Sequence, residues 1–271
     1  MRLKEMRKNY LFWMSVFILG FFVLTSVFAP YICRYSPSQQ SLSEKLLPPS
    51  EKHIFGTDEF GRDVFTRLLY AGRVSLSVAL VAVIISTFLG TLIGITAGFF
   101  KGVVDAVIVK IIDVFLSIPT FFLILMVVSL WSPSLLNIMI VIGLTSWPSL
   151  ARLVRAETLS VSERDFIKAV ESLGLSKWRI MVVHILPNVL APVVVAAVLG
   201  FGSAILVESG ISFLGLGIQP PQASWGNMLA SGKTYLGVAW WLSFFPGFAI
   251  FLVVLCFNLI GETLKQKWGG S

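Results

Sequence analysis

The sequence is dominated by long apolar stretches that contain no charged side chain. Residues 74–100 contain no Asp, Glu, Lys or Arg, and neither do residues 114–151. About 20 apolar helical residues cross a hydrocarbon layer that is about 30 Å thick. A helix also satisfies its own backbone hydrogen bonds, which lipid cannot do. The sequence therefore predicts an all-α membrane protein.

We predict six transmembrane helices. The first lies within 11–32 and the second within 74–100, whereas 114–151 is too long for one crossing and gives two spans with a break near 131–134. The fifth lies within 180–207 and begins after Pro187, because proline interrupts a helix. The sixth lies within 234–261. A cleavable signal peptide is the competing interpretation of 11–32, but its apolar region should be only about 7–15 residues long.

The distribution of cations predicts the orientation in the membrane. The chain has 21 Lys and Arg against 14 Asp and Glu, a net charge of +7. Most of these cations fall in 1–10, 101–110, 152–189 and the segment after 261. Cytoplasmic loops are enriched in Lys and Arg, so we expect both termini in the cytoplasm. The positive charge then reports membrane topology and predicts no nucleic-acid partner.

Other classes of function lack the residues they need. Only 13% of the residues are charged, about half the share in soluble domains, which excludes a soluble globule. The two histidines, His53 and His184, are not part of a cluster with metal-ligand spacing. Residues 231–234 resemble the end of a phosphate-binding loop, but the required upstream glycine is Asn227. We predict no catalytic residue, no metal site and no cofactor bound by this chain.

The outer segment 33–73 is predicted to contain an amphipathic helix from Phe60 to Leu69 on the outer membrane face, capped by Asp58 or Thr57. Its polar side would then be free to meet water or an external partner. The candidate docking residues are Asp58, Arg62, Asp63 and Arg67.

Two spans carry small residues at every fourth position. In the second span these are Ala82, Ser86, Gly90, Gly94 and Gly98, a pattern that favours close helix packing. In the fifth span the face ends in a carboxylate, and we predict that Gly200, Ala204 and Glu208 line a translocation pathway. The alternative for Glu208 is that its carboxylate reaches the outer headgroups.

The cytoplasmic segment 152–189 is longer than a turn between two spans requires. We predict a helix over 165–173, a stop at Gly174, a second helix capped by Ser176 over 177–185, and an end at Pro187. We call the segment from Asp165 to Pro187 the knob. A projecting knob of this kind is expected to dock on a partner.

The knob resembles the cytoplasmic coupling signature of ATP-binding-cassette (ABC) importer permeases. That signature is Glu-Ala-Ala, three residues, Gly, nine residues, Ile-x-Leu-Pro. Ala169, Gly174 and Pro187 match it, whereas Lys168, Val170 and His184 depart from it. The ending His-Ile-Leu-Pro-Asn is the form usual in the peptide and nickel branch. Residues 55–63, 212–217 and 225–229 are also similar to that branch, so the resemblance covers about 11–264.

The resemblance implies the second of two paired permease subunits, with the type I ABC importer permease fold, in a bacterial or archaeal cytoplasmic membrane. It divides the chain into a tail and first helix (1–32), an outer loop (33–73), a permease core (74–264) that includes the coupling loop 152–189, and a tail (265–271). The implied coupling residues are Arg164, Asp165, Lys168, Ala169, Gly174, Lys177, Arg179, His184 and Pro187.

The resemblance also implies the partners. These are a homologous permease, two cytoplasmic ATPases that hold ATP and Mg²⁺, an external solute-binding protein and membrane lipid. The expected cargo is a di- or oligopeptide, and nickel or metallophore uptake is the alternative within the family. A membrane enzyme or a self-contained channel is the alternative from another class. An enzyme would need a catalytic inventory, and a channel needs no cytoplasmic knob.

Overall fold

The computed structural model describes residues 2–131 and 134–268, and within these ranges it contains helices and no β-strand. The prediction of an all-α protein is confirmed. Its α-helices are α1 (Arg2–Val27), α2 (Ala29–Ile32), α3 (Val64–Phe100), α4 (Gly102–Ser117), α5 (Thr120–Leu130), α6 (Leu135–Ser162), α7 (Asp165–Ser172), α8 (Lys177–Arg179), α9 (Leu186–Phe213), α10 (Trp225–Gly232) and α11 (Trp241–Trp268). Short 3₁₀ segments lie at Leu42–Glu44 and Lys233–Tyr235, and Ile180–Ile185 is a π-helix, η2.

Five described helical runs are long and apolar enough to cross a membrane: α1, α3, α6, the run Lys177–Phe213 and α11. Helices α4 and α5 form a sixth if they count as one span, bent by 83°. The break predicted near 131–134 is confirmed, because α5 ends at Leu130 and α6 begins at Leu135; residues 132 and 133 lie outside the described ranges.

The bend between α4 and α5 was not predicted from the sequence. Ile118 is extended and Pro119 precedes the first residue of α5. A residue before proline is driven out of the helical region by the proline ring, so the helix cannot continue through this point. The segment expected to be a cytoplasmic turn around 101–110 is the first part of α4.

Several helices are longer than the predicted spans. Helix α3 starts at Val64 and has 37 residues, so it is about 55 Å long, well beyond the hydrocarbon thickness of about 30 Å. The separate interfacial helix predicted for 60–69 is therefore wrong, since 64–69 are the first turns of α3. In the same way, residues 152–162 continue α6 and do not belong to a loop.

Helices α3 and α6 pack closely against each other. A Cβ atom on Gly94 would lie 2.7 Å from the Ala151 carbonyl oxygen, and one on Gly98 would lie 2.8 Å from the Arg155 carbonyl oxygen. From the other side, a Cβ on Gly143 would lie 2.7 Å from the Cβ of Ile85. Only glycine permits this approach, and the predicted packing role of the small-residue repeat in α3 is confirmed.

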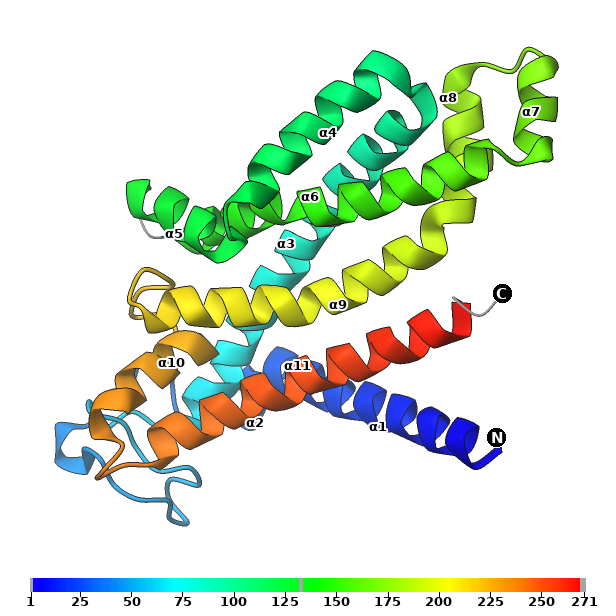
Figure 1. Cartoon of the computed structure of the whole chain (residues 1–271). Coiled ribbons are helices and arrows are strands. Elements are labelled where there is room, and N and C mark those ends of the chain that lie inside the picture. The colour runs from blue at the N-terminus through cyan, green and yellow to red at the C-terminus, as the bar shows by residue number, and fades with distance from the viewer. Residues whose placement is uncertain (1, 132–133, 269–271) are drawn as a thin grey trace.

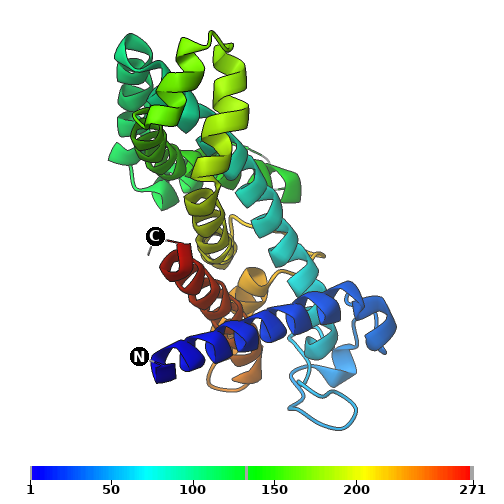
Figure 2. The same cartoon turned by 90° about the vertical axis from the view of Figure 1, so that its right-hand side faces the viewer.

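The two ends of the molecule carry different elements (Figure 1). Helices α7 and α8, the start of α1 and the end of α11 lie at one end. The connection 33–63 and α10 lie at the other end. Helices α1 and α11 lie side by side in both views (Figure 2), and α3 runs from the connection 33–63 to the end that carries α7.

The α3–α6 contact predicts the effect of a substitution. Gly94→Val would force its side chain against the Ala151 carbonyl and against Val154, whose Cβ lies 2.7 Å from the place that a Cβ on residue 94 would occupy. We expect the free energy of unfolding to fall by about 1–3 kcal/mol, the usual cost of overpacking a core. Thermal unfolding of the purified protein in detergent measures this change. Gly20→Val is the control, because no atom lies within 4 Å of a Cβ at that position; equal melting temperatures for the two variants would contradict the packing argument.

Candidate functional site

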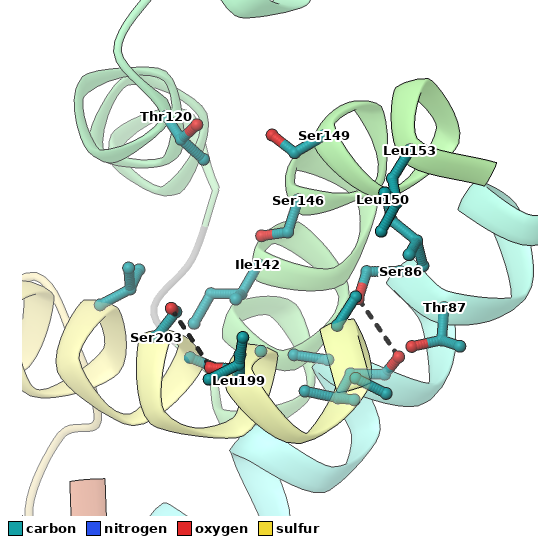
Figure 3. A pocket seen from close by; sticks show the side chains of 17 residues that line it. Ser86, Thr87, Thr120, Ile142, Ser146, Ser149, Leu150, Leu153, Leu199 and Ser203 are labelled. Atoms are coloured by element: carbon teal, nitrogen blue, oxygen red, sulfur yellow. Dashed lines mark hydrogen bonds between the residues drawn. The ribbon is translucent and has the colours of Figure 1, made fainter. Parts of the chain in front are cut away.

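A cavity of about 500 Å³ lies between α3, α5, α6 and α9 (Figure 3). Gly200 and Ala204, two of the predicted pathway residues, line it from α9. Six hydroxyl-bearing residues from four helices also line it: Ser86, Thr87, Thr120, Ser146, Ser149 and Ser203. Its volume is in the range of about 300–1,000 Å³ that is usual for small-molecule sites.

The lining of this cavity is neutral. None of the described residues that line it is charged, and the remaining lining residues are aliphatic. Figure 3 shows the hydroxyls of Ser146 and Ser149 on the side of α6 that faces Thr120 of α5. The cavity can therefore offer hydrogen bonds to a guest without attracting ions of either sign.

Glu208, the third predicted pathway residue, does not line the cavity. Its side chain is fully buried and accepts hydrogen bonds from Ser75 of α3 at 3.1 Å, from Ser212 at 2.7 Å and from Ser209 at 3.4 Å. Ser75 Oγ also accepts the backbone N–H of Trp225, the first residue of α10, at 3.2 Å. In this structure Glu208 therefore neither lines the cavity nor reaches the surface. Glu208 joins α3, α9 and α10.

The predicted docking residues, which lie just before and at the start of α3, are also buried. Asp58, Arg62, Asp63 and Arg67 are each 5–7% exposed, so the prediction that they face water or a partner is wrong. Arg62 Nε donates to Asp58 at 2.6 Å, and Arg67 Nε lies 3.5 Å from the same carboxylate oxygen. Asp63, and neither Asp58 nor Thr57, caps α3 by accepting the Thr66 N–H at 2.8 Å. Asp63 also contacts His53 Nδ1 at 2.9 Å.

These ion pairs hold the connection 33–63 together and join it to the start of α3. We call residues 33–63 the outer cap, after the side of the membrane predicted for them. Asp58 accepts the backbone N–H groups of Phe60 and Arg62, each at 2.9 Å, and so holds a tight turn ahead of α3. At its surface, Lys52 pairs with Glu44, and the hydrogen bond from Lys52 lowers the pKa of the Glu44 carboxyl. Amphipathic periodicity could not reveal burial of the polar side, because periodicity does not report what covers a face.

The knob has the predicted helix–glycine–helix form. Helix α7 ends at Ser172, and Gly174 follows with φ +73°, the left-handed conformation that glycine tolerates. Ser176 occupies the cap position of α8, although its side chain makes no capping hydrogen bond. The run does not end at Pro187: α8, η2 and α9 continue as one helical path, with Pro187 in the first turn of α9. Proline has no backbone N–H to donate, so Pro187 lacks one helical hydrogen bond at the change from π-helix to α-helix, and the helical path continues past it.

The knob presents both charged and apolar groups at its surface. The exposed coupling residues are Arg164, Asp165, Lys168, Ala169, Gly174, Lys177, Arg179 and Pro187. Leu173 and Trp178 are 76% and 65% exposed. His184 is half-buried, and its carbonyl accepts Asn188 Nδ2 at 2.7 Å. Large exposed apolar side chains among cations are a typical composition of a protein-docking surface.

The base of the knob is anchored to α3 and α9. Ile167 of α7 and Ile180 and Ile185 of η2 are buried in one cluster with Ile95 of α3 and Val189 of α9. The same cluster includes Leu150 and contacts Ala196, both of which line the cavity. Knob and cavity therefore share packed side chains. This link could not be predicted from the sequence, because it joins residues that are far apart in the chain.

Ion pairs tie the α3–α4 turn to α6. Arg155 Nη2 donates to Asp105 at 2.6 Å, and Lys101 Nζ lies 3.7 Å from Glu163 just before α7. Asp113 pairs with Arg152 of α6. This pair forms because α4 lies beside α6, which brings an arginine within reach of Asp113.

The outer cap predicts a second measurable effect. Asp58→Ala would leave Arg62 and Arg67 buried without their shared carboxylate, and loss of one partner of a buried ion pair costs about 3–5 kcal/mol. We expect a lower melting temperature for the purified protein. Lys52→Ala removes an ion pair whose lysine side chain is 62% exposed and should change the melting temperature little. Similar melting curves for both variants would show that the Asp58 network does not hold the cap.

Comparisons with known proteins agree with this architecture. Residues 90–269 match the family described as "Binding-protein-dependent transport system inner membrane component", and residues 2–49 match "N-terminal TM domain of oligopeptide transport permease C".

Two similar proteins come from bacteria. The dipeptide transport system permease protein DppC of Alkalihalophilus pseudofirmus is 42% identical over 263 residues, covering 97% of this chain and 86% of that protein. The probable D,D-dipeptide transport system permease protein DdpC of Escherichia coli is 39% identical over 261 residues, covering 95% and 88%.

A solved structure shares the fold. A chain of the MetNI methionine ABC transporter, determined in inward-facing conformations, superposes with a TM-score of 0.60 at 16% identity, covering 72% of this chain and 93% of that chain. At this identity the likeness concerns the fold alone. The family match and the relatives go further, and this chain belongs to the inner-membrane components of binding-protein-dependent transport systems.

Proposed function

We propose that this chain is a permease subunit of an ATP-driven importer of di- or oligopeptides. The observation that carries the transport role is the exposed knob, packed at its base on the helices that line the cavity. The peptide cargo is supported by the similar proteins, two of which are described as permeases of dipeptide systems. The described cavity lining contains no imidazole, a ligand that suits nickel, and its neutral hydroxyl groups suit a peptide better.

The proposed assembly contains a second homologous permease, two cytoplasmic ATPases that bind ATP and Mg²⁺, and an external solute-binding protein. The knob fits into the ATPases through its cations and through Leu173 and Trp178. The start of α1 and the end of α11 lie at the same end of the molecule as the knob (Figure 1). If the knob docks on cytoplasmic ATPases, both of these helix ends lie on the cytoplasmic side. The outer cap and α10 then face the binding protein.

ATP binding by the partners is proposed to move the knob. Because the knob shares the Ile167–Leu150–Ala196 cluster with the cavity wall, its displacement shifts α6 and α9 together. Gly200 and Ala204 line the resulting pathway from α9. Glu208 has no part in this step and holds the outer ends of α3, α9 and α10 in place.

The first test is Gly174→Val. Gly174 has φ +73°, and a Cβ there would meet no atom within 4 Å, so the substitution acts through backbone strain alone. We expect the reconstituted complex to retain its helical bundle but to lose ATPase association or peptide-dependent hydrolysis. The matched control is Gly215→Val, with φ +81° and equally open surroundings in the connection after α9. Normal coupling in Gly174→Val would contradict the role of the knob.

The second test concerns the pathway. Gly200→Cys and Ala204→Cys, made in a Cys33→Ser background, place thiols on the cavity wall. Small polar thiol reagents should label them in at least one nucleotide state and slow peptide uptake. Gly202→Cys is the control, because Gly202 is buried against Val254 and Asn258 of α11. Protection of positions 200 and 204 in every nucleotide state would identify the face as simple helix packing.

A further inference from the structure

The cavity hydroxyls differ in whether they already have a partner. Along the helices, many Ser and Thr side chains donate back to the preceding turn: Thr145 to the Val141 carbonyl, Thr96 to Leu92 and Ser129 to Met126, each at 2.7 Å. In the cavity, Ser86 and Ser203 do the same, at 3.2 and 3.4 Å.

Four cavity residues have no such bond. Within the described part of the chain, the side chains of Thr87, Thr120, Ser146 and Ser149 make no hydrogen bond to protein. Ser146 and Ser149 are three residues apart, on one face of α6 on either side of Pro148, and Figure 3 shows both hydroxyls directed to the side of Thr120. Their hydrogen-bonding capacity is available to whatever occupies the cavity.

A hydroxyl can both donate one hydrogen bond and accept others. It can therefore pair with either the N–H or the carbonyl of an amide, and every peptide carries both groups whatever its side chains are. A charged wall would instead hold peptides of opposite charge and repel the rest. Passage through a membrane protein also requires contacts that are weak enough to release the guest.

We propose that Ser146 and Ser149, with Thr120 opposite them, bind the main chain of the passing peptide and make the cavity indifferent to its side chains. This proposal rests on the peptide-import function proposed above. The groups that are bound are the amide N–H and carbonyl groups of the peptide. The residues of this chain that bind them are Ser146, Ser149 and Thr120. A single neutral hydrogen bond contributes little on its own, which suits binding that must be brief.

The test uses the reconstituted complex in proteoliposomes, loaded with its binding protein, and three dipeptides: Ala-Ala, Lys-Ala and Glu-Ala. A fourth cargo is Ala-Ala with its amide nitrogen methylated, which removes the internal amide N–H. We expect S146A combined with S149A to slow uptake of the three unmodified dipeptides by a similar factor, about 5- to 150-fold, as for the loss of two hydrogen bonds. The ratio of Ala-Ala uptake to uptake of the methylated cargo should be smaller in this variant than in the wild-type complex.

Three variants make the result specific. S146T combined with S149T keeps both hydroxyls and should restore most of the uptake. Ser149→Asp should favour Lys-Ala over Glu-Ala, which shows that position 149 meets the cargo. Ser129→Ala is the control, because that exposed serine donates to its own helix and lies outside the cavity lining.

The proposal is overturned if the double alanine variant takes up all four cargoes as the wild-type complex does, or if Ser149→Asp leaves the Lys-Ala to Glu-Ala ratio unchanged. A wild-type complex that imports neither these dipeptides nor longer peptides such as tri- and pentaalanine would instead refute the proposed function. The two failures are therefore distinguishable. Because the binding protein is the same throughout, its own preferences cancel in each comparison with the wild-type complex.

Discussion

The close approach of α3 and α6 is the contact on which the rest of the structure depends. Gly94 and Gly98 of α3 lie directly against the backbone of α6, and Gly143 of α6 lies directly against α3. In lipid no hydrophobic effect drives helices together, so close packing of small residues contributes much of the association. This pairing sets Ser86 and Thr87 of α3 beside Ser146 and Ser149 of α6, and the cavity forms where α9 and α5 complete the wall.

The same helix pair supports the knob. Ile95 of α3 and Leu150 of α6 enter the cluster that buries Ile167 of α7 and the π-helical segment η2. π-Helical turns are rare and often occur at functional sites. Here the turn lies between the knob and α9, the helix that carries Gly200 and Ala204. A partner that moves the knob thus acts on a packed core that is continuous with the cavity wall.

Two groups of polar residues stabilise the end opposite the knob. Glu208 accepts hydrogen bonds from serine hydroxyl groups of α3 and α9. Asp58 pairs with two arginines and accepts two backbone N–H groups. Burial of a carboxyl group without hydrogen-bond partners is costly, and both side chains are surrounded by donors. Their chemistry had suggested contact with cargo and with a binding protein. Their observed partners give them structural roles: those of Asp58 are local in the chain, whereas Glu208 also accepts a hydrogen bond from the distant Ser75.

The sequence by itself determined what depends on local composition. Uncharged stretches fixed the helical membrane class and most of the spans, and the spacing around Gly174 fixed the knob and its left-handed glycine. The small-residue repeat of α3 also predicted a packing face correctly. Only the tertiary structure decided which polar groups meet: Asp113 with Arg152, Glu208 with Ser75, and the free hydroxyls of α6 with a shared cavity. Helix periodicity assigns a residue to a face, but the partner on that face is set by helix crossings between segments that are distant in the chain.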